Sequence, residues 1–116
     1  MGRLTTHVLD TVRGAPAGGL LIELWSTDPV PIRLETVKTN ADGRTDKPLL
    51  EGDALKAGRY ELHFHVGDYH RKSGTAVSDP AFLEIVPVRF GIADPSGHYH
   101  VPLLLSPYGY STYRGS

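Results

Sequence analysis

The side chains of this sequence that could do chemistry near neutral pH are chiefly its histidines. The 116 residues include six histidines and no cysteine, and histidine is the side chain whose unperturbed pKa lies closest to neutrality. The absence of cysteine rules out a thiolate nucleophile, and no serine stands in a Gly-x-Ser-x-Gly turn. The sequence therefore favours water activated by histidine, with an arginine to hold an electron-rich substrate or its developing negative charge.

Two of these histidines, His98 and His100, lie in a segment that alternates like a β-strand. In a strand, Tyr99, Val101 and Leu103 would share the core face, and both histidines would point to the other face. From this pattern alone, an ordinary solvated strand face is favoured over a site. Neutral imidazoles at this spacing can also share a zinc ion, so a zinc hydrolase built on His98 and His100 is one alternative.

Three further histidines are expected in solvent. His63 and His65 oppose the apolar face of their own predicted strand, and His70 lies in a polar loop. Residues 67–76 lack both alternation and the length of a stable free helix, so we expect one short helical turn there, capped by Asp68.

The elements that must position these residues are short strands. The 13 glycines and 9 prolines are spread through the chain, which is typical of an all-β sandwich. A turn at 40–43 delivers Arg44 to the beginning of a strand, and Pro87 inside a strand-like run indicates an edge strand or a bulge. Alternation is strongest at 20–25 and 60–66, and weaker strands are predicted at 4–9, 32–39, 44–48, 82–90, 99–106 and 108–113.

Length, charge and composition exclude several classes of protein. The 116 residues suffice for one domain, 1–116, and not for two. A formal net charge of −1 makes nucleic acid an unexpected partner. No apolar stretch approaches the length of a membrane span, and the first residues, Met1 to Asp10, lack the apolar run of a secretion signal. We therefore expect no membrane partner and a cytoplasmic location.

Three segments carry a resemblance to a known family. Residues 4–10 are Leu-Thr-Thr-His-Val-Leu-Asp, residues 98–107 are His-Tyr-His-Val-Pro-Leu-Leu-Leu-Ser-Pro, and residues 113–116 are Tyr-Arg-Gly-Ser. With them the sequence resembles the transthyretin-like 5-hydroxyisourate hydrolases over essentially the whole chain. The last four residues match the ending that distinguishes the enzymes of this family from transthyretin, a hormone carrier on the same fold.

The resemblance implies a transthyretin-like two-sheet β-sandwich with one short helix. It also implies a homotetramer with active sites in a central channel, where two dimers meet. The implied reaction opens the cyclic amide of 5-hydroxyisourate to 2-oxo-4-hydroxy-4-carboxy-5-ureidoimidazoline in urate degradation, with no cofactor and no metal. The implied catalytic residues are His7, Arg44 and His98, and those implied for substrate binding are Tyr113, Arg114, Gly115 and Ser116.

The chemistry of these side chains suits the implied roles. The planar fork of Arg44 can orient a flat, acceptor-rich molecule and stabilise an oxyanion. His7 and His98 would deprotonate water and later return the proton. Which of the two is the base stays open. His100 also belongs to the motif, and we place it second to His98 as a candidate catalytic residue. The alternative from another class is a transthyretin-like carrier of a small aromatic ligand, which would require a more apolar channel.

Overall fold

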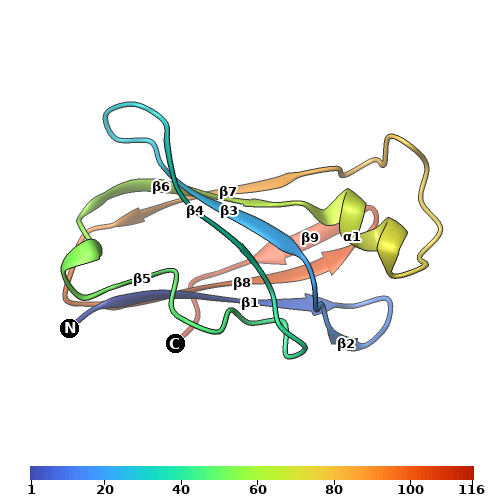
Figure 1. Ribbon diagram of the computed structural model, residues 1–116, viewed down its shortest axis with the longest axis horizontal. Helices are drawn as coiled ribbons and strands as arrows, with labels where there is room; N and C mark the ends of the chain where they lie inside the picture. Colours follow the sequence, from blue (N-terminus) through green and yellow to red (C-terminus); the bar gives the residue numbers. More distant parts are fainter.

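The computed structural model describes residues 1–116 as a sandwich of two β-sheets with one short α-helix (Figure 1). The all-β class predicted from alternation is thereby confirmed. The elements in chain order are β1 (Arg3–Asp10), β2 (Ala15–Pro16), β3 (Leu21–Ser26), β4 (Ile32–Lys38), β5 (Leu50–Glu51), a 3₁₀ turn (Gly52–Ala54), β6 (Gly58–Phe64), α1 (Val66–Lys72), β7 (Val86–Ile92), β8 (His98–Ser106) and β9 (Gly109–Thr112).

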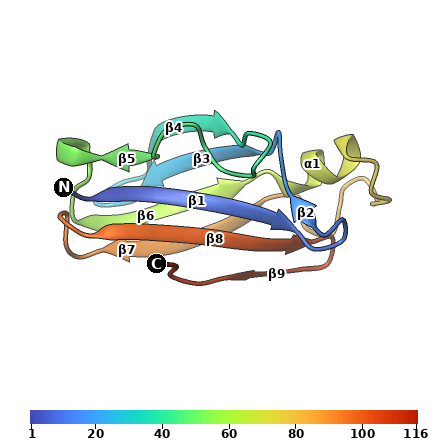
Figure 2. The ribbon, with the colours of Figure 1, turned by 90° about the horizontal axis from the view of Figure 1, so that it is seen from below.

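The first sheet joins the two ends of the chain. Its strand order is β2-β1-β8-β9, and β5 also pairs with β1. β1 and β8 run parallel and side by side, with Thr5 opposite His100 and His7 opposite Pro102 (Figure 2). Successive side chains of a strand point to opposite faces, and Leu4 and Val8 are buried. Thr5, His7 and His100 therefore share the face of the sheet that points away from the core.

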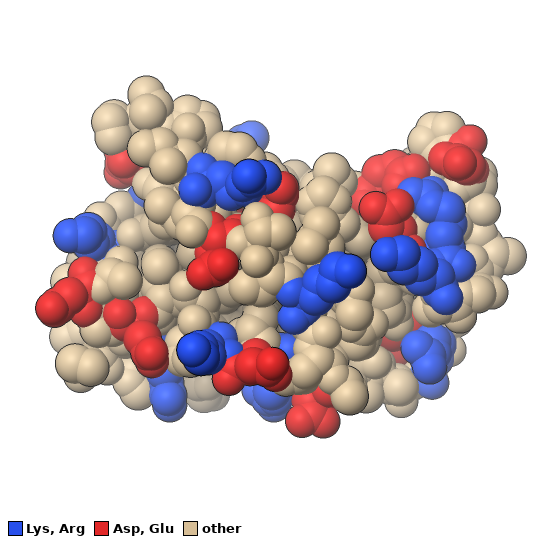
Figure 3. All heavy atoms as spheres, in the orientation of Figure 1, with Lys and Arg blue, Asp and Glu red and all other residues tan.

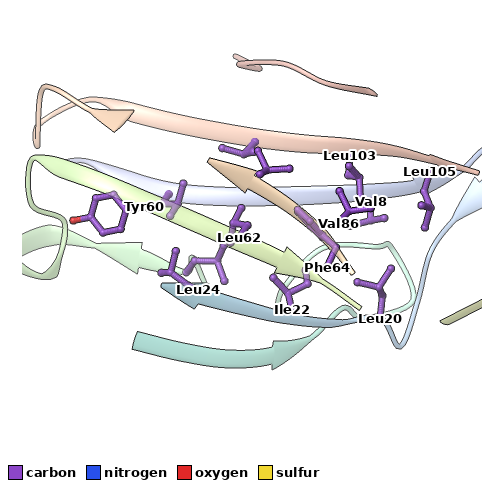
Figure 4. Packing of buried hydrophobic residues seen from close by; sticks show 14 of the residues in the cluster. Val8, Leu20, Ile22, Leu24, Tyr60, Leu62, Phe64, Val86, Leu103 and Leu105 are labelled. Atoms are coloured by element: carbon purple, nitrogen blue, oxygen red, sulfur yellow. The ribbon is translucent and has the colours of Figure 1, made fainter. Parts of the chain in front are cut away.

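The second sheet has the order β4-β3-β6-β7 and packs its inner face against the first. Its inward side chains include Ile22, Leu24 and Phe64, which meet Leu103 and Leu105 of β8 in the core (Figure 4). All five are fully buried. Burial of each such side chain contributes about 1.5–3 kcal/mol to folding, so this core holds β1 and β8 in a fixed register.

The single α-helix lies close to the predicted helical turn, but its N-terminus differs. α1 begins at Val66 after His65, and Asp68 lies in its first turn without making a capping hydrogen bond. The sequence also predicts His70 in solvent, which is wrong, because α1 turns His70 toward the sandwich and buries it completely. A helix of 7 residues shows too little periodicity for its inward face to be recognised.

One predicted strand is absent, and one predicted strand begins too early. Residues 44–48 form no strand, because Arg44 makes only an isolated bridge to His7 and Thr45 Oγ1 donates to Lys47 O in a local turn. Residues 82–85 precede β7 as a bend, in which Ala81 N–H donates to the Glu84 carboxylate. The short strands β2 and β5 carry too few residues to alternate, and the sequence does not predict them.

The remaining edges and surfaces agree with the composition. β7, which contains Pro87, is an edge strand of its sheet, as the proline indicates. On the face drawn in Figure 3, basic and acidic side chains lie interspersed. The one α-helix, α1, has 7 residues, which is too short to span a bilayer.

Candidate active site

A polar pocket of about 420 Å³ opens on the outer face of the first sheet, beside the beginnings of β1 and β8. Of its twelve lining residues only one is hydrophobic. Four of the residues are central to its chemistry, and they come from four parts of the chain: Thr5, Arg44, His100 and Ser116.

His100 is held at this pocket by the parallel pairing of β1 and β8. Thr5 lies directly opposite, and its Oγ1 is hydrogen-bonded to His100 Nδ1 at 2.8 Å. Thr5 Oγ1 is the only side-chain hydrogen-bond partner of the His100 imidazole, and it engages Nδ1 and not Nε2. A histidine whose Nδ1 is fixed by a neighbour presents Nε2 in a defined orientation.

The surroundings of His100 favour its neutral form. Burial lowers the pKa of His100 below its usual value, and the charges of Arg44 and His7 lower it further. A hydrogen bond to the Thr5 backbone opposes these effects in part. A neutral imidazole with a free nitrogen can accept a proton from water at neutral pH.

Arg44 reaches the pocket through the predicted turn at 40–43. Asn40 Oδ1 accepts hydrogen bonds from the backbone N–H groups of Asp42 and Arg44, as expected of an asparagine that stabilises a turn. Gly43 has a φ of +75°, and a Cβ there would collide with the Val8 carbonyl oxygen. Only glycine suits this position, and the turn places Arg44 against His7.

His7 anchors the same turn from β1. It forms an isolated antiparallel bridge with Arg44, and its Nε2–H donates to Asp42 O at 2.9 Å. Its side chain is half-buried and lies near enough to His100 to affect the pKa of that residue. In the single chain His7 does not line the polar pocket.

His98 lines the pocket but has a different environment from His100. Its side chain is exposed, and Nε2 contacts Met1 O at 3.2 Å. The two histidines share the outward face, as the alternation predicts. The family resemblance implies a catalytic role for His98 and gives His100 second place, and in the structure the charges of Arg44 and His7 act on His100.

The C-terminal tail is divided between two cavities. Gly115 N–H donates to His100 O at 2.8 Å, and Ser116 lines the polar pocket. A Cβ on Gly115 would lie 2.5 Å from His100 Cδ2, so the tail backbone packs directly on the imidazole. Tyr113 and Arg114 instead line a more apolar cavity of about 280 Å³ beside β7.

Two other histidines lie on the outer face of the second sheet. His63 Nε2 is 2.9 Å from Glu61 Oε1, and His65 Nε2 is 3.3 Å from Glu23 Oε1. The sequence predicts both side chains in solvent, but they are only partly exposed, because each pairs with a carboxylate. No group of three or more His, Cys, Asp or Glu side chains is arranged to hold a metal ion.

Comparison with known proteins places the chain in a family. The model of the HIUase/Transthyretin family matches residues 4–115. The chain belongs to this family. It is 64% identical over 116 residues to "5-hydroxyisourate hydrolase 2" of Rhizobium meliloti, covering 99% of this chain and 97% of that protein. It is 59% identical to the 5-hydroxyisourate hydrolase of Ralstonia nicotianae over the full length of both.

Solved structures show the same fold in enzymes and in a carrier of the family. An (S)-allantoin synthase matches 99% of this chain with a TM-score of 0.95 and 45% identity, over 44% of its own length. The Klebsiella pneumoniae 5-hydroxyisourate hydrolase matches 98% of this chain and 99% of its own, with a TM-score of 0.81 and 34% identity. Sea bream transthyretin in complex with thyroxine matches 97% of this chain and 94% of its own, with a TM-score of 0.84 and 31% identity.

Thr5 is the residue of the pocket that sequence reasoning misses. It appears in the sequence as one polar residue in an alternating strand, and its partner His100 lies 95 residues away. Only the pairing of β1 with β8 brings the two side chains together. The one available signal is that Thr5 and His7 share the outward face of the predicted strand 4–9.

Proposed function

We infer that this chain hydrolyses the cyclic amide of 5-hydroxyisourate, giving 2-oxo-4-hydroxy-4-carboxy-5-ureidoimidazoline in urate degradation. The observation that carries this inference is the placement of His100, held at Nδ1 by Thr5, with Arg44 in one polar pocket, where burial and the charge of Arg44 lower the pKa of His100. The relatives that share the whole length of the chain are named as hydrolases of this substrate. The pocket thus offers a base for water and a cation for a planar, oxygen-rich molecule.

In the proposed mechanism neutral His100 carries its proton on Nδ1, donated to Thr5 Oγ1, and its Nε2 accepts a proton from water as the oxygen adds to the amide carbonyl of the ring. The carbonyl oxygen becomes an oxyanion, which the guanidinium of Arg44 stabilises. The ring C–N bond then breaks, and the leaving nitrogen takes up a proton from protonated His98. The proton held by His100 returns through water to His98, which restores both histidines. The product is a carboxylic acid that ionises at neutral pH.

We assign distinct roles to the other proposed catalytic residues. His98, exposed at the pocket, orients the substrate and delivers the proton to the leaving nitrogen. His7 holds the turn that carries Arg44 through its bond to Asp42 O and adds positive charge near His100 when protonated. Of the tail residues, Ser116 lines the polar pocket, where it can contact substrate, and Gly115 binds His100 O beside it.

A carrier function is less well supported. Sea bream transthyretin, solved with thyroxine, shares the fold and 31% of the sequence. In this chain, however, the pocket on the outer face carries Arg3, Arg44 and Lys47 among its lining residues. An apolar aromatic ligand would displace water from these charged groups without replacing its hydrogen bonds. This desolvation disfavours binding of such a ligand.

We also propose that the protein is a homotetramer with the sites where dimers meet. β7 and β9 end their sheets as open edges, and unpaired edges favour pairing with another copy. Phe82 and Tyr108 are 72% and 75% exposed, and their rings lie side by side at a tilt of 41°, which is unusual for aromatic side chains facing solvent. The absence of nucleic-acid and membrane partners and the cytoplasmic location stay predictions.

The direct test generates hydroxyisourate in the cuvette with urate oxidase and follows the decay of its ultraviolet absorbance. Added protein should accelerate the decay in proportion to its concentration. Metal analysis of the same preparation tests the zinc alternative, because stoichiometric zinc that is needed for activity would contradict a mechanism based on His100 and Arg44 alone. Acceleration no greater than that by an unrelated protein would contradict the proposed function.

A further inference from the structure

We propose that Arg114 and Tyr99 form a clamp that docks the C-terminal tail on His100, so that Arg114 acts as a positioning residue and does not bind the substrate. This inference rests on the proposed function for its kinetic consequences only. It changes the role implied for Arg114 by the family ending, and it gives Tyr99 a role that no motif assigns to it.

The position of the Arg114 side chain carries the proposal. Its guanidinium carbon lies 4.3 Å from the centroid of the Tyr99 ring, within the range of a cation–π contact. Its Nη2 donates to His98 O at 3.2 Å. Arg114 lines the more apolar cavity beside β7 and is not among the residues of the polar pocket.

Tyr99 is a rigid support for this contact. It is only 8% exposed and packs in the core. Its hydroxyl accepts hydrogen bonds from the backbone N–H groups of Ala93 and Asp94, at 3.2 and 3.0 Å. The Tyr99 ring is therefore fixed by the core at one end and by its hydroxyl at the other. Because the ring is already ordered, the Arg114 guanidinium can stack on it at little entropic cost.

The docked tail in turn determines where His100 lies. Gly115 follows Arg114 directly, donates its N–H to His100 O, and has no Cβ, which allows its backbone to pack on the imidazole. Ser116 then enters the polar pocket. Thr5 holds Nδ1 from β1, and the Gly115 backbone confines the imidazole from the other side. Loss of the contact between Arg114 and Tyr99 would remove the restraint by Gly115.

The experiment measures docking of the tail without substrate. In protein labelled with ¹⁵N-glycine, hydrogen exchange of the Gly115 amide reports its bond to His100 O. Arg114→Met, which keeps much of the length but removes the charge, should speed this exchange by about 2- to 30-fold, the range that corresponds to a cation–π contact. Arg114→Lys should lie between Arg114→Met and the wild type.

Variants of Tyr99 supply the matched control. Tyr99→Phe retains the ring and should leave Gly115 exchange close to that of the wild type, whereas Tyr99→Leu should speed it by no more than Arg114→Met, which also loses the bond to His98 O. The double variant Arg114→Met/Tyr99→Leu should exchange no faster than Arg114→Met alone, because the cation–π contact is already lost in that variant. If Tyr99→Leu does not fold, the Arg114→Met, Arg114→Lys and Tyr99→Phe series still tests the clamp.

Kinetics separate positioning from substrate binding. A positioning residue should lower kcat with little change in KM, whereas loss of a ground-state substrate contact raises KM. Unchanged Gly115 exchange in Arg114→Met, or a raised KM with unchanged kcat, would overturn the proposal. Because exchange is measured without substrate, inactivity of the wild type toward hydroxyisourate would contradict the proposed function and leave the test of the clamp intact.

Discussion

At the scale of single residues, His98 and His100 lie on the same face of β8 but differ in burial and in their charged neighbours. Burial lowers the pKa of His100, and the charges of Arg44 and His7 lower it further. His98 is exposed and contacts Met1 O. The base and the proton donor can therefore be told apart by their dependence on pH.

The first prediction concerns the acid limb of the pH profile. A base must be neutral, so kcat/KM should fall with decreasing pH around the pKa of His100, which lies below the usual value of about 6.5. His98→Asn should lower activity on the order of 10²-fold and keep this limb. A His98→Asn profile that is flat on the acid side would assign the base to His98 instead.

Arg44 provides the companion measurement. Its positive charge disfavours protonated His100, so Arg44→Gln should raise the pKa of His100 and move the acid limb of the remaining activity to higher pH. A limb that stays in place, or moves to lower pH, would show that Arg44 does not act on this histidine.

The sequence predicts the orientation of these histidines but not their different surroundings. Alternation around Tyr99 and Val101 is enough to place His98 and His100 on the outward face. Their difference arises from Thr5, Arg44 and Gly115, which reach His100 from other parts of the chain. Such contacts depend on the pairing of β1 with β8, which no local pattern reveals.

At the scale of elements, α1 is held to the first sheet by a buried polar network. The Tyr69 hydroxyl donates to Asp10 Oδ2 at 2.7 Å, and the backbone N–H groups of Val12 and Arg13 donate to Asp10 Oδ1. Asp10 is only 1% exposed. The carboxylate therefore fixes the end of β1, the following turn and the helix together.

The second prediction is that Tyr69→Phe destabilises the protein and spares its activity. It leaves one oxygen of a buried carboxylate without its donor, which costs about 1–3 kcal/mol in free energy of unfolding. Urea denaturation should show this loss, while kcat/KM stays unchanged. Tyr108→Phe, at a position 75% exposed, should change stability by less than about 0.5 kcal/mol. Equal stability of both variants would show that the Tyr69 bond contributes nothing.

The third prediction concerns the tail as an element. β9 ends at Thr112, and the core residues all precede it. A chain that ends at Thr112 should therefore keep its fold and lose about 1–2 kcal/mol through the contacts of Arg114 and Gly115. Its activity should collapse, because Gly115 and Ser116 no longer confine His100 and the pocket. Full activity of this chain would remove the tail from the site.

Alternation of apolar and polar residues predicts the buried strands but not the loop that carries Arg44. Residues 20–25 and 60–66 are predicted as strands because one face of each is buried, and β3 and β6 confirm them within one or two residues. The predicted strand at 44–48 is wrong because the position of Arg44 comes from the turn and from His7, not from sheet pairing. The site therefore includes a loop residue whose place is set by tertiary contacts.

At the scale of the whole molecule, the pocket lies on the open outer face of the first sheet. A single chain does not enclose it. The fourth prediction is that the protein forms a tetramer that covers this face and the edges at β7 and β9. Light scattering should give a mass four times that of the single chain at micromolar concentration. A monomer under these conditions would contradict both the assembly and a site formed where dimers meet.

The central claim is that His100 and Arg44 hydrolyse 5-hydroxyisourate, and one measurement tests it directly. Hydroxyisourate made in place by urate oxidase is followed by its ultraviolet absorbance, with wild-type protein and with His100→Asn at equal concentration and equal oligomeric state. The wild type should accelerate the decay, and His100→Asn should be slower on the order of 10²- to 10⁴-fold. Equal rates for the two proteins, or a wild-type rate no higher than the spontaneous decay, would contradict the claim.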